Sequence, residues 1–94
     1  MKAYNLINDN GNAAQNQIVV SLDNAVNYFV SYSCPVCKID KGRVFLHPIY
    51  WDFSKTTTKH LYIFLRSFGW DITKKADVEK RIKSGEFIVK DFNY

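Results

Sequence analysis

The segment 50–68 constrains the fold more than any other part of the chain, because strand-like sequence gives way there to one strongly periodic helix. Ser54 is a good N-cap residue and Gly69 is a typical C-terminal stop, so the helix is expected to begin at Lys55. A helix with one apolar stripe needs a surface to pack on, and the rest of the chain is expected to supply a sheet. The stripe consists of Leu61, Phe64, Leu65 and Phe68.

Four short β-rich segments are the predicted strands of that sheet. Segments 18–22 and 28–32 are separated by turn-forming residues and predict one hairpin. Segments 36–39 and 44–47 flank Asp40-Lys41-Gly42-Arg43, which has the residues of a tight turn and predicts a second hairpin. Both hairpins are antiparallel, because a short turn reverses the direction of the chain.

The two ends of the chain are less regular. Residues 1–16 are expected to form a loose arm with no more than one short edge strand. Thr73 is the expected cap of a second, shorter helix over 74–84, and 86–92 is expected to be a final strand or an extended tail. The prediction is therefore one α+β domain over residues 1–94, with a small antiparallel sheet of three to five strands, one main helix and a second short helix.

Composition fits one small domain and not a disordered chain. The chain has 94 residues, of which 47% are hydrophobic and 16% aromatic. Neither a secretory signal nor a run of the roughly 20 apolar residues that span a membrane is visible. We expect a cytoplasmic protein with no membrane partner, in which both cysteines stay reduced.

Positive charge is concentrated in the helical half of the chain. Residues 55–90 hold nine basic and four acidic side chains, whereas residues 1–54 hold four of each. On the main helix, the cations and one tyrosine fall within a narrow arc opposite the apolar stripe. This basic helix face suits phosphate contact with base stacking, an acidic protein surface, or solvent alone. It consists of Lys55, Lys59, Tyr62 and Arg66, with Lys74, Lys75, Lys80, Arg81 and Lys83 as a second basic group.

Tyr50 and Trp51 have two interpretations. In one, Trp51 and Phe53 form the corner of the core between sheet and helix, and Asp52 caps the helix. In the other, Tyr50 or Trp51 is an exposed anchor for a partner, because aromatic residues are enriched at interface hot spots. Both can hold for different residues of the pair.

Cys34 and Cys37 form a CxxC pair that raises a zinc hypothesis. His47 and His60 would complete four donors, but the spacing is not that of a known zinc finger. A redox pair needs its first cysteine at a helix N-terminus, whereas this pair precedes a strand. The simpler alternative is that Cys37 is a small buried hydrophobe, and no metal or cofactor is predicted.

No catalytic constellation is visible in the sequence. Histidine is the usual acid–base residue of enzymes, but His47 and His60 have no partner nearby in the chain. We can name no set of nucleophile, base and oxyanion donor, so the chain is predicted not to be an enzyme.

Several segments together resemble an uncharacterised family of small proteins found mainly in bacteriophages and mobile elements. These are Ser31-Tyr32, Lys38 to Asp40 with Gly42 to Val44, the most specific run Tyr50-Trp51-Asp52-Phe53-Ser54 with the residues up to Thr57, and Arg81 to Glu86. The resemblance spans roughly residues 15–93. It implies a phage accessory protein, but it assigns no activity.

These observations favour a non-enzymatic binding protein that acts in the cytoplasm of an infected bacterium. Its expected target is a host or phage macromolecule, with a protein favoured over a nucleic acid. An inhibitor of a host antiviral-defence protein, such as a CRISPR effector, is one instance. The alternative is a small nucleic-acid-binding module that uses the basic helix face. A homodimer through an exposed strand edge is compatible with so small a sheet.

Overall fold

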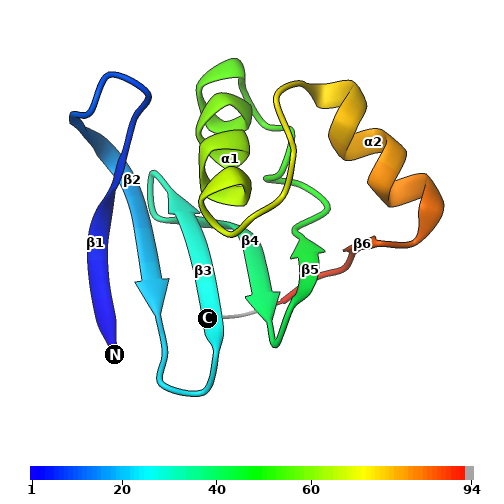
Figure 1. The fold of residues 1–94 in the computed structure, drawn as a ribbon, viewed down its shortest axis with the longest axis horizontal. Coiled ribbons are helices and arrows are strands. Elements are labelled where there is room, and N and C mark those ends of the chain that lie inside the picture. Colours follow the sequence, from blue (N-terminus) through cyan, green and yellow to red (C-terminus); the bar gives the residue numbers. More distant parts are fainter. Residues whose placement is uncertain (93–94) are drawn as a thin grey trace.

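A computed structural model shows a six-stranded sheet with two helices, and it describes residues 1–92 (Figure 1). Neighbours in the sheet follow the order of the chain, β1-β2-β3-β4-β5-β6. The elements are β1 Lys2–Ile7, β2 Ala13–Ser21, β3 Val26–Ser31, β4 Cys34–Asp40, β5 Arg43–Leu46, α1 Lys55–Ser67, α2 Lys75–Ser84 and β6 Phe87–Val89.

The strand count corrects the prediction of a three-to-five-stranded antiparallel sheet. Strands β1 to β5 form an antiparallel meander, in which the predicted hairpins are β2–β3 and β4–β5. Strand β6 instead pairs parallel to β5, after a connection that contains both helices. The sheet is therefore mixed, while the class remains α+β. The predicted arm 1–16 contains the edge strand β1, which the prediction allowed, and also the start of β2.

Helix α1 packs across one face of the sheet through the predicted apolar stripe. Leu61, Phe64 and Leu65 are fully buried, and the Phe64 ring stacks on Phe29 of β3 with centroids 5.6 Å apart. Phe68 departs from the prediction. It lies at the C-cap, is 37% exposed and only flanks Phe64. The stripe ends one turn earlier than the spacing indicated.

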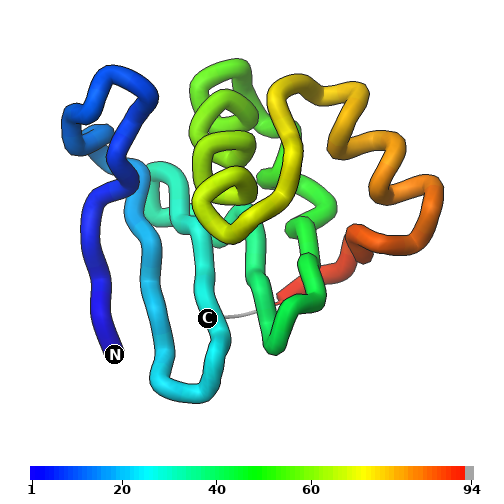
Figure 2. Tube along the Cα trace, viewed as in Figure 1, coloured from blue at the N-terminus to red at the C-terminus, as the bar shows by residue number. Residues whose placement is uncertain are grey.

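The connection between the two helices runs back alongside α1 (Figure 2). Ile72 in this connection is fully buried, and its carbonyl oxygen accepts a hydrogen bond of 2.8 Å from Arg66 Nη1. Helix α2 then buries Val78 against the same core, with Ile82 partly buried beside it. No helix among residues 1–92 is both long and apolar enough to span a membrane.

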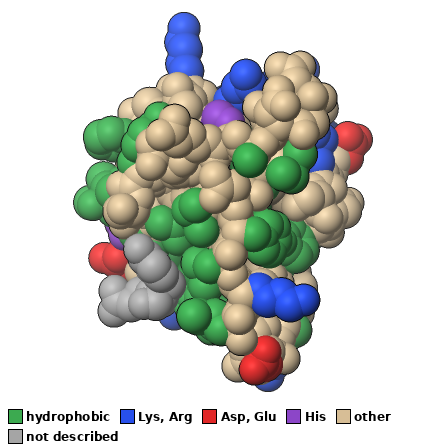
Figure 3. Space-filling view, turned by 90° about the vertical axis from the view of Figure 1, so that its left-hand side faces the viewer, with side chains coloured by type: hydrophobic (Ala, Val, Ile, Leu, Met, Phe, Trp, Pro, Cys, Tyr) green, Lys and Arg blue, Asp and Glu red, His purple; other side chains and the backbone are tan. Residues whose placement is uncertain are grey.

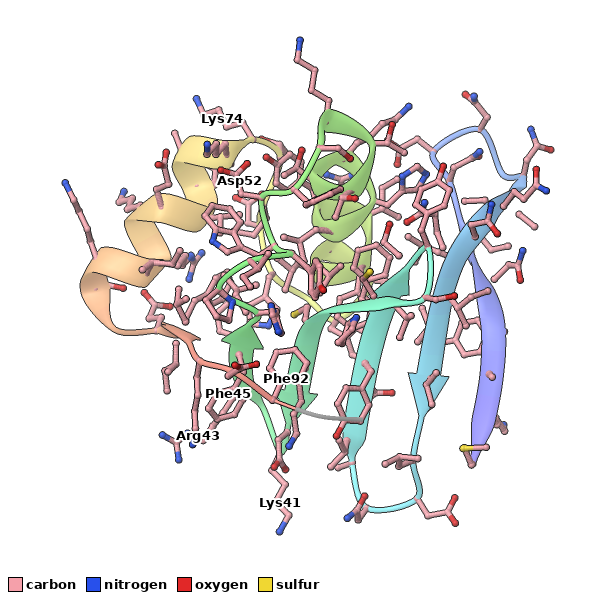
Figure 4. The ribbon with its side chains drawn as sticks, turned by 180° about the vertical axis from the view of Figure 1, so that it is seen from behind. Lys41, Arg43, Phe45, Asp52, Lys74 and Phe92 are labelled. Carbon is pink, nitrogen blue, oxygen red and sulfur yellow. The ribbon has the colours of Figure 1, made fainter. Side chains whose placement is uncertain are left out.

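The described part of the tail that follows β6 lies over part of the opposite face of the sheet. Phe92 lies across this face, away from α1, and its ring is 6.1 Å from that of Tyr28 (Figure 4). Val26, Tyr28 and Val30 are buried there. Toward the β1 edge, hydrophobic side chains gather at the surface (Figure 3). Tyr4 and Ile7 of β1 are about half exposed. Helix α1 and Phe92 thus pack on opposite faces of the sheet.

The start of α2 is held by Asp77 and not by the predicted Thr73 cap. The N-cap is Lys74, without a side-chain hydrogen bond, and the Asp77 carboxylate accepts from the Thr73 backbone N–H (3.0 Å) and hydroxyl (3.1 Å). The Thr73 N–H is the main reason that the pKa of Asp77 lies below its usual value. Thr73 is therefore a donor to the first turn of α2.

Acid is expected to weaken this contact. Because the pKa of Asp77 is lower in the folded than in the unfolded state, its contribution is present above about pH 4 and is lost as the pH falls through the folded pKa. Asp77→Asn should therefore lower the urea midpoint at neutral pH, and the difference from the wild type should shrink in acid. Asp71→Asn is the matched control, because exposed Asp71 accepts no hydrogen bond within residues 1–92. A difference that stays constant with pH would contradict this role.

Candidate functional site

The chain between β5 and α1 is organised around the buried imidazole of His47. His47 Nδ1 accepts from the backbone N–H groups of Ile49 (3.2 Å) and Tyr50 (3.4 Å), while Nε2 lies 3.0 Å from Asp91 Oδ1. The Tyr50 ring packs on the imidazole at 4.5 Å and meets Phe53 edge-on at 6.2 Å. We call this segment, residues 47–54, the hinge. Its contacts fix Tyr50 half-buried and send Phe53 outward.

The turn between β3 and β4 brings a second aromatic side chain to the same place. Tyr32 and Ser33 both have positive φ, at 49° and 67°, so they form a two-residue turn without glycine. The Tyr32 N–H donates to the Asn16 carbonyl oxygen at 2.9 Å, which anchors the turn to β2. The turn leaves the Tyr32 ring at the surface beside the hinge.

A pocket of about 350 Å³ lies between this turn, the hinge and the first turn of α1. Two large aromatic side chains of its lining are mostly exposed: Tyr32 at 58% and Phe53 at 70%. We call these two residues the rim. The lining is Ser31, Tyr32, Cys34, Val36, Tyr50, Phe53, Ser54, Thr56 and Thr57.

The exposure of Phe53 corrects the prediction that it forms a corner of the core. Trp51 is partly buried against the core as that interpretation required, but Phe53 points away from it. Asp52 does not cap α1 either. The cap is Ser54, as predicted, whose Oγ accepts from the Thr57 N–H at 3.1 Å. Tyr50 is half-buried and forms part of the pocket wall.

Three hydroxyl groups form a polar floor in this mostly apolar pocket. Ser54 Oγ donates to Thr57 Oγ1 at 3.1 Å, and Thr57 Oγ1 lies 3.3 Å from Ser31 Oγ. Ser31 and Thr57 are both buried. Gln17 lies opposite Ser31 on β2, and neither polar atom of its buried side chain has a hydrogen-bond partner within residues 1–92. We call Ser31, Ser54 and Thr57 the hydroxyl floor.

The two cysteines have different environments. Cys34 lines the pocket and is half-buried, whereas Cys37 is fully buried in the core, where loss of solvent raises the pKa of its thiol far above the usual range. Cys37 is therefore the small buried hydrophobe of the simpler interpretation. The four donors of the zinc hypothesis do not converge, since no group of three or more His, Cys, Asp or Glu side chains within residues 1–92 is placed to hold a metal ion.

The basic helix face is only partly free. Lys55 and Lys59 are exposed and form no ion pair within the described chain. Arg66 instead pairs with Asp9 at 3.2 Å, besides its bond to Ile72. Tyr62 packs partly against the core, and this burial raises the pKa of its phenol. Two of the four predicted residues therefore have roles within the fold.

The second basic group is divided in the same way. Lys75 Nζ lies 2.7 Å from Asp52 Oδ2 and over the Trp51 ring, and the bond to Asp52 raises the pKa of Lys75. Arg81 pairs with Glu86 and stacks over Trp70. Lys74 and Lys80 are exposed, and Lys74 lies at the start of α2, near Asp52 (Figure 4). Lys75 and Arg81 thus fasten α2 to the rest of the domain.

These features define a small α+β domain with one aromatic-rimmed surface pocket at the N-terminal end of its main helix. The chain belongs to the family of unknown function DUF8033, whose family model matches residues 1–85. The match covers the sheet up to β5, both helices and every residue of the pocket. No curated protein and no solved structure matches the chain.

Proposed function

We propose that this chain is a non-catalytic binding protein that holds another protein at the rimmed pocket. The observation that carries the proposal is the rim itself, because two large aromatic side chains from two separate connections are each more than half exposed around one pocket. Isolated exposed hydrophobic residues are ordinary, whereas a group around a concavity is typical of an interaction site. Aromatic anchors of this kind supply much of the energy of protein interfaces.

We propose more specifically that the chain is a phage accessory protein that binds a host protein in the cytoplasm. An antiviral-defence protein is one instance of such a target. Its support is the resemblance carried by the run 50–54, which here builds one wall of the pocket. The nucleic-acid alternative has less support. Arg66, Lys75 and Arg81 are engaged with carboxylates of the chain itself, which leaves fewer cations for phosphate contact.

The test is affinity capture from a bacterial host lysate with three baits: the wild type, Phe53→Ser and Tyr4→Ser. Tyr4 is a matched control, because it is an aromatic residue 49% exposed on β1, away from the pocket. For a purified captured protein, we expect Phe53→Ser to weaken binding by tenfold or more, which corresponds to about 1.4 kcal/mol or more. Tyr4→Ser should bind like the wild type.

Cys34 provides a direct readout of pocket occupancy. In the folded chain a thiol reagent should label Cys34 alone, because Cys37 is fully buried. The captured protein should slow this labelling. Unchanged labelling in the complex, or equal loss of binding in the Phe53 and Tyr4 variants, would place the interface elsewhere. Tight binding of oligonucleotides that is lost in Lys59→Glu would favour the nucleic-acid alternative instead.

A further inference from the structure

We infer that the occupant of the pocket is an extended segment of the partner protein in which an apolar side chain is flanked by carboxylates. This inference rests on the proposed function and adds the chemistry of the partner. Three features of the pocket support it: its size, the positive charge of the α1 N-terminus beside it, and the hydrogen-bonding capacity of the hydroxyl floor.

The size of the pocket limits what enters it. A volume of about 350 Å³ is at the lower end of the roughly 300–1,000 Å³ found for small-molecule sites, so it admits one or two side chains and no folded element. The walls are apolar where Val36, Tyr50 and Phe53 form them. An aliphatic or aromatic side chain is therefore the group that gains most from entering, because it buries its surface against these walls.

The charge beside the pocket is positive and has no counterion within the described chain. The pocket is lined by Ser54 and Thr56, so the positive end of the α1 dipole opens onto it. The first turn of α1 contains no acidic residue, and Lys55 and Lys59 are exposed without an ion pair in residues 1–92. The nearby carboxylate of Asp52 is already held by Lys75. Carboxylates on the partner would complement this charge.

The hydroxyl floor has one hydrogen left to donate. Ser54 gives its hydroxyl hydrogen to Thr57, and one hydrogen lies between Thr57 and Ser31, where either oxygen can be the donor. The other hydroxyl hydrogen of this pair has no acceptor within residues 1–92, and the buried amide of Gln17 beside Ser31 is likewise unpartnered. Buried polar groups are normally paired. A carbonyl or carboxylate oxygen of the occupant that reaches the floor accepts this hydrogen from Ser31 or Thr57, so that every hydroxyl group of the floor is paired.

The experiment is selection of a random dodecamer peptide library on the immobilised chain, with Lys55→Glu and Lys83→Glu selected in parallel. Lys83 is the matched control, because it is exposed on α2 and makes no ion pair within residues 1–92. We expect peptides with Leu, Phe or Trp next to Asp or Glu to be enriched on the wild type and on Lys83→Glu. On Lys55→Glu the same peptides should bind about tenfold more weakly.

A second measurement tests the floor. Ser31→Ala should weaken an enriched peptide by about three- to tenfold, the effect of one lost hydrogen bond, and Phe53→Ser by more. Enrichment of basic or uncharged peptides, equal binding to both lysine variants, displacement of the peptide by oligothymidylate, or no enrichment at all would each overturn the inference. The proposed function is judged separately by the lysate capture. It survives if the captured partner depends on Phe53 but presents no acidic segment.

Discussion

Replacing Phe64 by alanine is expected to lower the free energy of unfolding by about 3–5 kcal/mol, the usual cost of deleting a buried phenyl ring. Phe64 is fully buried between the sheet and α1, stacked on Phe29 with centroids 5.6 Å apart and in contact with Phe68 at 5.0 Å. Small domains have a total stability of about 5–15 kcal/mol. The variant should therefore be close to unfolding at physiological temperature. Urea titration followed by tryptophan fluorescence measures the loss.

Phe53→Ala is the matched control for this prediction. The substitution is the same, but Phe53 is 70% exposed, and we expect a change within about 0.5 kcal/mol. The pair separates a core phenylalanine from a rim phenylalanine, which lie only eleven positions apart in the chain. A loss at Phe53 as large as that at Phe64 would mean that Phe53 belongs to the core, and the binding proposal would lose its main observation.

Helix α1 could be predicted because its determinants lie within about fifteen neighbouring residues. The Ser54 side chain caps the first turn, and the apolar spacing fixes the buried face as far as Leu65. Gly69, with φ of +93°, allows the chain to leave the helix. Each of these signals is local, so no knowledge of the sheet was needed to read it.

The full sheet could not be predicted, because its missing strands depend on distant partners. In β1 only Leu6 is buried, so the strand shows no alternation and is held mainly by backbone pairing to β2. Strand β6 has three residues, and its parallel register joins Val44 to Phe87 across both helices. Pairing over such a separation leaves no local pattern in the sequence.

The pocket leaves no local signal in the sequence either. Tyr32 and Phe53 come from segments that look unrelated in the sequence, and the sequence predicts Phe53 in the core because large aromatic residues are usually buried. The turn at Tyr32 and Ser33 adopts positive φ without glycine, so it carried no turn signal. Only the tertiary arrangement brings the two rings to one concavity.

The sequence predicts more unpaired basic side chains on the helices than the structure has. Asp9 lies 57 positions before Arg66, yet the two side chains meet. The Lys75 and Arg81 pairs with Asp52 and Glu86 likewise use acids from other elements. Lys55 and Lys59 stay available because neither forms an ion pair within the described chain.

His47→Ala is expected to lower the free energy of unfolding by about 2–4 kcal/mol. The imidazole is buried, and its loss leaves the N–H groups of Ile49 and Tyr50 without their acceptor. It also removes the partner of Asp91 and the ring that packs on Tyr50 at 4.5 Å. The hinge, which carries the rim residue Phe53, should therefore become more mobile.

The rate of Cys34 labelling under native conditions should report this loosening, because Cys34 lines the same pocket as Tyr50 and Phe53 of the hinge. We expect faster labelling in His47→Ala than in the wild type, at urea concentrations well below the unfolding transition. His60→Ala is the control, because within residues 1–92 the His60 ring makes one hydrogen bond, with the Thr56 carbonyl oxygen on its own helix at 2.8 Å, and its loss should be nearly neutral. If both histidine variants lost stability equally, or if Cys34 reacted no faster in His47→Ala, His47 would not be what holds the pocket in shape.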